Sequence, residues 1–302
     1  MQLGFVSAIL ADLSLDEVLA FAAGEGFDCV ELMCWPPGKS SRRYAGVCHL
    51  DVSDFTDDAA ARTRDLIRAR GVVISGLGYY PNPLEADADH RRTVADHLMK
   101  VIAAAPKLGV KIVNTFIGRD HTKSVEANWP AFQQVWLPIV RHAEAHGVAL
   151  GLENCPMLFS ADEWPGGKNL PTSPALWRRI FDDLNSPNVG LNLDPSHLVW
   201  QMIDDAKCIR EFGPKIVHVH AKDTRIDREK LYEVGILGTG WHTAKIPGLG
   251  DVNWSAFFSA LTDAGYRGAV CIEVEDRAYE GSLEDRQRAL RQSKRYLEQF
   301  MG

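Results

Sequence analysis

Residues 131–153, AFQQVWLPIVRHAEAHGVALGLE, contain one complete helix-to-strand unit. Apolar residues recur three and four positions apart over Ala131–His146, which predicts an amphipathic helix. Gly147 follows, and glycine there permits the left-handed helix end that returns the chain toward a strand. The short apolar run Ala149–Glu153 has the length of a buried strand. The stretch therefore predicts a crossover helix followed by a strand of a parallel sheet.

The same unit recurs along the whole chain. Further apolar runs of strand length lie at Leu3–Ala8, Cys29–Met33, Val72–Leu77, Ile112–Phe116, Val189–Leu193, Ile216–His220 and Ala269–Val274. Helical spacing of apolar residues is found between them, at Leu15–Ala23, Asp57–Arg70, Arg91–Leu108 and Ser173–Leu184. Glycines such as Gly71 and Gly109 end several of these helices, and Ser14 with Glu17 forms a capping-box pattern at the first one.

The number of units decides between the two architectures that alternate strands and helices. A doubly wound open sheet for dinucleotides carries G-x-G-x-x-G after its first strand, and this chain has no such motif there. Eight regular units favour closure into a barrel, and α/β barrels of this length form one domain. We therefore predict a single-domain (β/α)₈ TIM barrel over residues 1–302.

Composition and charge argue against several classes of partner. The formal net charge is −7 and no long Lys/Arg run occurs, so we expect no binding to nucleic acid. The N-terminus lacks a basic signal-peptide region, and no apolar run approaches the roughly 20 residues that span a bilayer, so we expect no membrane association. The six cysteines form no C-x-x-C pair and are interpreted as reduced thiols, which favours a cytoplasmic location.

Two connections are longer than ordinary strand-to-helix loops. They run over about residues 156–171 and 224–254. In a barrel both would follow the carboxyl ends of strands, which is the catalytic face. Long loops at that face are candidates for covering a substrate.

Four strands in the second half of the chain end in a residue that can bind a metal. These residues are Glu153, Asp194, His220 and Glu273. Because barrel strands converge at their carboxyl ends, residues far apart in sequence can meet there around one position. Three carboxylates and one imidazole suit Mn²⁺, Co²⁺, Mg²⁺ or Zn²⁺. We predict one divalent metal at this place and favour Mn²⁺.

Residues near these strand ends are candidates for binding a substrate. His197 follows Asp194 closely, and Lys222 can face substrate oxygens. Trp35 and Trp241 can pack against the apolar faces of a sugar or cyclitol. Each has a structural alternative: a loop histidine, an ion pair, or core packing.

The surroundings of His220 give two further expectations. Asp223 can orient either His220 or a nearby loop. Side chains alternate between the faces of a strand, and we expect only one of His218 and His220 to face the barrel interior. Glu31 ends the second strand and receives no assigned role at this stage.

The chain resembles the xylose isomerase-like barrel superfamily, in particular its sugar isomerase and epimerase branch, which includes ketose 3-epimerases and inosose dehydratases. The resemblance rests on Gly151-Leu152-Glu153-Asn154, Leu193-Asp194-Pro195-Ser196-His197, His218-Val219-His220-Ala221-Lys222-Asp223, residues 247–254 (PGLGDVNW) and Ile272-Glu273. It implies that Glu153, Asp194, His220 and Glu273 bind the metal and that Glu153 and Glu273 act as bases on opposite faces of a sugar. It also implies that His197 contacts substrate, that Arg225 lies near a substrate-contacting arginine, and that a homo-oligomer can form.

The favoured function is proton abstraction next to the carbonyl of a ketose or keto-sugar, giving an isomerase or epimerase. The same enediolate could instead lose a β-substituent, so a dehydratase or lyase acting on a keto-inositol or a 3-keto-glycoside is the alternative. An endonuclease IV-like nuclease is less favoured, because that enzyme adds further histidines for three zinc ions and the run Gly76–Tyr80 has none. A non-catalytic barrel subunit is also less favoured, since the candidate ligands are all present.

Overall fold

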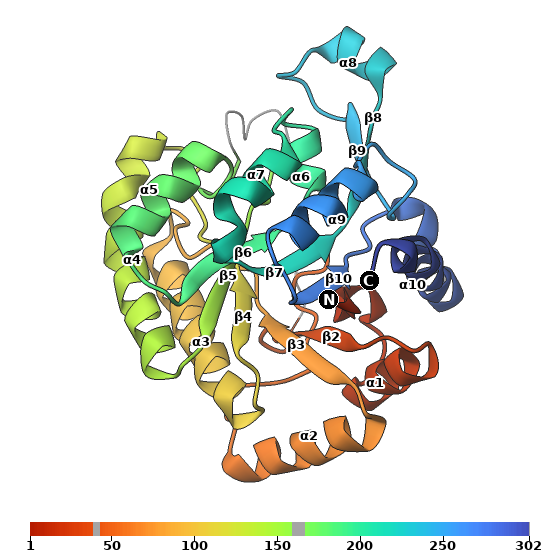
Figure 1. The fold of residues 1–302 in the computed structure, drawn as a ribbon. Coiled ribbons are helices and arrows are strands. Elements are labelled where there is room, and N and C mark those ends of the chain that lie inside the picture. Colours follow the sequence, from red (N-terminus) through yellow and green to blue (C-terminus); the bar gives the residue numbers. More distant parts are fainter. Residues whose placement is uncertain (39–42, 159–166, 302) are drawn as a thin grey trace.

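Eight parallel strands form a closed barrel in the computed structural model, which describes residues 1–38, 43–158 and 167–301. The strands are β1 (Gln2–Val6), β2 (Cys29–Met33), β3 (Val73–Gly78), β4 (Ile112–Thr115), β5 (Ala149–Glu153), β6 (Val189–Leu193), β7 (Ile216–Ala221) and β10 (Ala269–Ile272). The barrel closes where β1 pairs in parallel with both β2 and β10. The predicted TIM barrel is confirmed (Figure 1).

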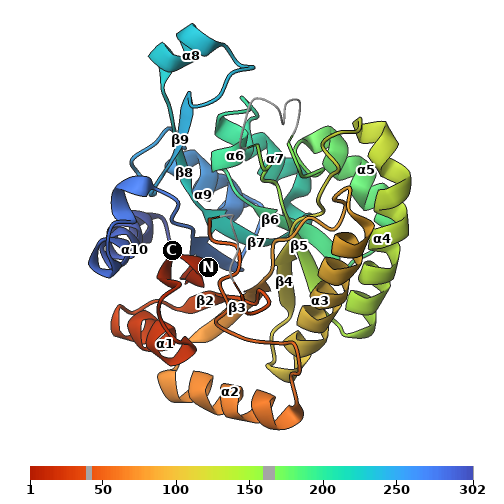
Figure 2. The ribbon, with the colours of Figure 1, turned by 180° about the vertical axis from the view of Figure 1, so that it is seen from behind.

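Helices surround the barrel as an outer layer (Figures 1 and 2). They are α1 (Leu15–Gly24), α2 (Asp57–Arg70), α3 (Ala88–Lys107), α4 (Val125–Ala145), α5 (Pro174–Leu184), α7 (Asp205–Phe212), α9 (Trp254–Asp263) and α10 (Leu283–Leu297). Shorter helices lie in the connections: α6 (Ser196–Val199), α8 (Arg228–Val234), η1 (Ser7–Leu10), η3 (Gly213–Lys215), η4 (Arg277–Tyr279) and η5 (Glu298–Phe300). No helix in the described part of the chain is long and apolar enough to cross a membrane.

Helix caps and helix-ending glycines lie where the sequence predicted them. Ser14 and Glu17 form both hydrogen bonds of a capping box at α1. Gly71 and Gly147 have φ values of +68° and +64°, which glycine adopts without steric cost. Helix α4 begins at Val125, six residues before the predicted start, because Ser124 caps it by accepting from Ala127 N.

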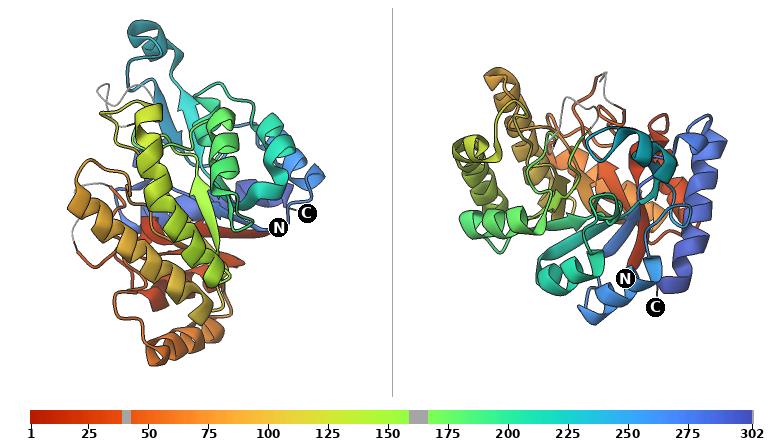
Figure 3. Two further views of the ribbon diagram at one scale, coloured as in Figure 1. Left: turned by 90° about the vertical axis from the view of Figure 1, so that its left-hand side faces the viewer. Right: turned by 90° about the horizontal axis from the view of Figure 1, so that it is seen from above.

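An arm projects from the catalytic face (Figures 1 and 3). It consists of β8 (Asp223–Ile226), α8 and β9 (His242–Lys245), with the two strands paired antiparallel. The predicted long connection over 224–254 therefore contains a hairpin and a helix that the sequence did not predict. The other predicted connection, 156–171, lies partly outside the described residues.

The six cysteines are all free thiols in the structure. Most are buried among apolar side chains, such as Cys29 and Cys271 in the barrel strands.

Candidate active site

The four predicted metal ligands meet at the carboxyl end of the barrel. Glu153 ends β5, Asp194 follows β6, His220 lies in β7 and Glu273 follows β10. One ligand atom from each lies within 4.8 Å of the others. Asp194 and His220 are fully buried, whereas the Glu273 side chain is 19% exposed. These residues, which we call the four-residue cluster, come from four strands that converge as predicted.

Buried polar atoms without a hydrogen-bond partner point into this cluster. Asp194 Oδ1 accepts from Ser196 N at 2.8 Å, which leaves Asp194 Oδ2 directed at the cluster. Asp194 Oδ2, His220 Nδ1 and His197 Nε2 are buried and have no hydrogen-bond partner among the described residues. Buried polar atoms are rarely left in this state. A divalent cation would satisfy them, so the residues present fit a metal ion.

A second group of potential ligands, Glu31, His218 and His220, lies deeper in the barrel. Both ring nitrogens of His218 already have hydrogen-bond partners: Nδ1 lies 3.0 Å from Asn192 Oδ1, and Nε2 lies 3.2 Å from Ser75 Oγ. This group is therefore a hydrogen-bonded network beneath the cluster and a weaker candidate for holding a metal.

The expectation that only one of His218 and His220 faces the barrel interior is wrong. Both rings are fully buried inside the barrel, and their centroids lie 5.7 Å apart. The reason is the period of a strand: residues two positions apart point to the same face. The two rings occupy successive layers of the barrel.

Glu31 holds His220 in place. Glu31 Oε2 lies 2.8 Å from His220 Nε2, and both side chains are fully buried. The Tyr80 hydroxyl donates to the other oxygen of Glu31. A proton on His220 Nε2 shared with Glu31 leaves Nδ1 to face the four-residue cluster. A buried carboxylate that orients a metal-ligating histidine is a common arrangement in metal sites.

Asp223 orders a loop and does not contact His220. Its carboxylate accepts from Gly248 N at 2.9 Å, Val252 N at 3.0 Å and Trp254 Nε1 at 2.9 Å. Of the two roles predicted for Asp223, the loop is the one found. The bonds attach residues 248–254 to the start of the arm.

Electrostatics keep Glu153 and Glu273 ionised, whereas burial raises the pKa of Asp194. Burial opposes ionisation of Glu153, but the imidazoles of His197 and His220 beside it outweigh burial and hold the pKa of Glu153 well below its usual range. Burial likewise opposes ionisation of Glu273, but the charge of Lys222 beside it outweighs burial and lowers the pKa of Glu273 to about 2. Burial would lower the pKa of His220, but the charges of Glu31 and Glu273 raise it well above 6.5. His220 therefore carries a proton that an incoming cation must displace.

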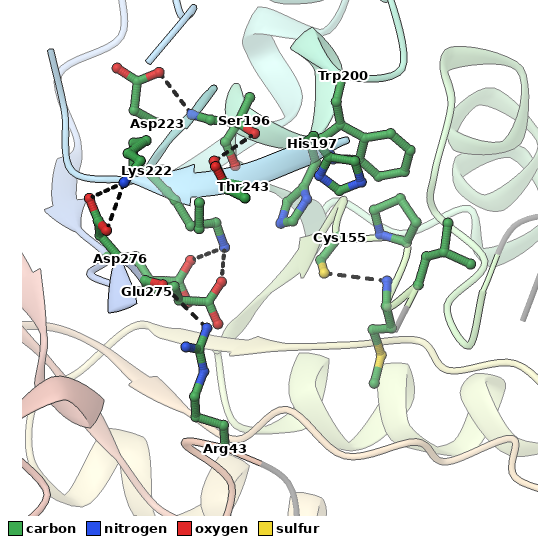
Figure 4. A pocket seen from close by; sticks show the side chains of 18 of the residues that line it. Arg43, Cys155, Ser196, His197, Trp200, Lys222, Asp223, Thr243, Glu275 and Asp276 are labelled. Atoms are coloured by element: carbon green, nitrogen blue, oxygen red, sulfur yellow. Dashed lines mark hydrogen bonds and ion pairs between the residues drawn. The ribbon is translucent and has the colours of Figure 1, made fainter. Parts of the chain in front are cut away.

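Lys222 and His197 lie against the cluster. Lys222 Nζ is 2.6 Å from Glu273 Oε2, 3.1 Å from Glu275 Oε2 and 3.1 Å from Asp194 Oδ2. His197 Nε2 is 3.3 Å from Asp194 Oδ2 and 3.6 Å from Glu153 Oε1. Figure 4 shows both side chains directed into the same space.

A cavity of about 750 Å³ opens above the cluster. All five residues predicted to contact substrate line it: His197, Lys222, Arg225, Trp35 and Trp241. Arg225 is exposed at the rim, and Trp241 is 2% exposed with its Nε1 donating to Gly238 O. Sequence reasoning missed Trp200, which lines the cavity three residues after His197. The i to i+3 spacing on one helical turn was the available signal.

The family model described as xylose isomerase-like TIM barrel matches residues 19–300. The chain belongs to this family. The resemblance inferred from the strand-end motifs is thereby confirmed. Proteins similar to this chain include an L-ribulose 3-epimerase and, over about a third of the chain, an inosose dehydratase.

Two relatives and one solved structure show how far the likeness extends. The uncharacterized protein YfiH of Bacillus subtilis is 29% identical, over 91% of this chain and 93% of its own length. L-ribulose 3-epimerase of Mesorhizobium japonicum is 26% identical, over 88% of this chain and 77% of its own length. The crystal structure of the IOLI protein with a bound zinc atom superimposes with a TM-score of 0.72 at 18% identity, covering 99% of each chain. The structural likeness supports the shared barrel.

Proposed function

We propose that the chain is a divalent-metal-dependent isomerase or epimerase that moves a proton next to the carbonyl of a ketose or keto-sugar. The observation that carries the proposal is the four-residue cluster, into which His220 Nδ1 points without a hydrogen-bond partner and Asp194 Oδ2 points beside the Lys222 ammonium. The likeness to an L-ribulose 3-epimerase over most of the chain supports the reaction class.

The metal would be held by Glu153, Asp194, His220 and Glu273. When bound, it supplies a positive charge that stabilises the negative charge developing on the substrate oxygens. A zinc atom is present in the related IOLI structure, and we favour Mn²⁺ here because three of the four ligands are carboxylates.

The two glutamates are the proposed bases. Glu153 is buried and removes the proton from the carbon next to the carbonyl on one face of the sugar. Glu273 is ionised before the substrate binds, so it first takes up a proton from water, which its 19% exposure permits, and then delivers that proton on the other face. Return to the same carbon gives an epimer, whereas return to the neighbouring carbon gives an isomer. Loss of a β-substituent from the same enediolate gives the dehydratase or lyase alternative.

Lys222 and His197 are proposed to contact the substrate oxygens. The Lys222 ammonium lies within 3.1 Å of Asp194, Glu273 and Glu275, so a hydroxyl bound between the two bases meets a fixed positive charge. His197, on the short helix α6, lies 3.3 Å from the same Asp194 oxygen that Lys222 contacts. Lys222 is buried and the His197 side chain is only 12% exposed, which strengthens a hydrogen bond to a substrate.

The test is deuterium incorporation from D₂O into a panel of ketoses, inososes and 3-keto-glycosides, with Mn²⁺ added. We expect at least one substrate to gain a carbon-bound deuterium and expect Glu153→Gln and Glu273→Gln to abolish the gain. Glu211→Gln is the matched control, because Glu211 pairs with Arg178 on the outer helices. Full exchange in both active-site variants would refute the two-base mechanism. Product analysis by NMR then separates epimer, isomer and elimination product.

A further inference from the structure

The cavity is larger than a single sugar requires. Small-molecule sites span about 300–1,000 Å³, and this cavity of about 750 Å³ lies in the upper half of that range. The cavity extends from Glu153 and Glu273 to the arm, where residues 238–245 line it. The space beyond the proposed bases is therefore lined by the arm and can hold a second group.

An aromatic wall stands at this outer end, formed by Trp200, Trp241 and His242. The rings of Trp200 and His242 stack with centroids 4.5 Å apart and planes at 4°. Trp241 meets both edge-on, at 6.2 Å from Trp200 and 4.8 Å from His242. Three rings that support one another in this way form a rigid surface, and aromatic faces bind the C–H faces of sugars and other flat rings. All three line the cavity.

The wall is uncharged and held at a fixed place. Burial and the nearby charge of His197 lower the pKa of His242 to about 4, so its ring is neutral at physiological pH. Lys245 Nζ bonds both oxygens of Asp276 at 3.0 and 3.1 Å, which ties β9 to the loop that follows Glu273. Ile236, an apolar side chain that is 47% exposed, lies at the rim of the same end. A ring bound on the wall would cover it.

We infer that Trp200, Trp241, His242 and Ile236 form a second ring-binding subsite and that the substrate is a keto-sugar in glycosidic linkage. The keto-sugar ring occupies the space between Glu153 and Glu273, and the ring attached through the glycosidic oxygen packs on the aromatic wall. The inference rests on the proposed function, because the first ring is placed by the two bases. Binding energy from the remote ring would then be available for positioning the reacting ring.

The test compares three probes in the D₂O exchange assay: a free ketose, the 3-keto derivative of a methyl glucoside, and the 3-keto derivative of a glucosyl disaccharide. We expect kcat/KM for exchange to be at least about tenfold higher for the disaccharide than for the methyl glycoside. We expect Trp200→Ala to reduce that ratio to near one and Trp200→Phe to restore most of it. Tyr232→Ala is the matched control, because Tyr232 is 85% exposed on α8 and does not line the cavity.

Ile236→Ser keeps the test available if Trp200→Ala does not fold, since Ile236 is half-exposed and its replacement disturbs little packing. We expect it to lower the same ratio by a factor of about two to five. Equal rates for the two glycosides, or exchange with the free ketose alone, would overturn the subsite and leave the proposed function standing. A preference that none of the wall variants changes would overturn its location. Exchange with none of the probes in metal-loaded protein would overturn the proposed function itself.

Discussion

Replacing Glu31 by glutamine should weaken metal binding without removing a metal ligand. Glu31 Oε2 lies 2.8 Å from His220 Nε2, and both side chains are completely buried. Glutamine keeps the shape of the side chain and removes its charge. His220 then loses the carboxylate that fixes which of its nitrogens faces the four-residue cluster.

The expected magnitude follows from the kind of bond that is lost. A buried hydrogen bond to a charged group contributes about 1.5–3 kcal/mol. At 1.4 kcal/mol per factor of ten, Glu31→Gln should weaken metal binding by roughly 10- to 100-fold. One effect acts in the other direction, because the charge of Glu31 also raises the pKa of His220 and so favours the competing proton. Measurement at alkaline pH minimises that competition.

The assay is calorimetric titration of the metal-free protein with Mn²⁺ and with Zn²⁺. Glu211→Gln makes the same chemical change on the outer surface and should leave the affinity unchanged. Thermal melting of the metal-free variant checks that it is folded. If folded Glu31→Gln binds both metals within twofold of the parent protein, Glu31 does not orient His220 toward a metal.

Three further predictions follow from the described contacts. Because the pKa of His220 is raised, metal binding at a pH below that pKa should release a proton, and the metal affinity should increase as the pH rises. Calorimetric titrations in buffers of different ionisation heat measure the number of protons released. A result of no proton release at neutral pH would contradict the prediction. Asp223→Asn should lower the free energy of unfolding, measured in urea, by roughly 2–4 kcal/mol, because the amide NH₂ group of asparagine would face the N–H donors of residues 248–254 and could not accept from them. A change below about 0.5 kcal/mol would contradict this prediction. Gly4→Ala should lower the free energy of unfolding by about 1–3 kcal/mol, because its Cβ would lie 2.3 Å from a backbone carbonyl oxygen of β2. In the control Gly24→Ala, the new Cβ meets nothing within 4 Å, so this variant should not be destabilised. Equal effects of the two substitutions in urea unfolding would contradict the packing argument.

Much of the barrel could be predicted because its signals are local and repeat. Strands β2, β5 and β6 have the predicted bounds, since each is a buried apolar run closed by a polar residue or turn. Strand β1 ends at Val6, two residues early, because Ser7–Leu10 turn into a 3-10 helix. The sequence also predicted that the four cluster residues lie close together, because closing the sheet into a barrel brings equivalent strand ends together.

The arm and the aromatic wall were not predictable in the same way. Strands β8 and β9 have four residues each, and only Asp223 and Thr224 at the start of β8 are buried, so the strands leave no alternating pattern in the sequence. Trp200 and His242 stand 42 positions apart, and only the hairpin register brings their rings into contact. Such contacts depend on how a long connection folds back, which propensity and periodicity do not encode.

The two halves of the barrel contribute differently to the site. This difference explains why the site residues of the second half are much easier to recognise in the sequence than those of the first half. Strands β5, β6, β7 and β10 each end in a potential ligand, and that repetition is visible in the sequence. Strand β2 contributes through a single residue, Glu31, whose partner His220 is 189 positions away. A ligand set repeats because the strands are equivalent, but the group that orients one ligand needs to exist only once. Residues of the second kind are therefore identified from burial and distance in the structure, and Glu31 is the clearest example in this chain.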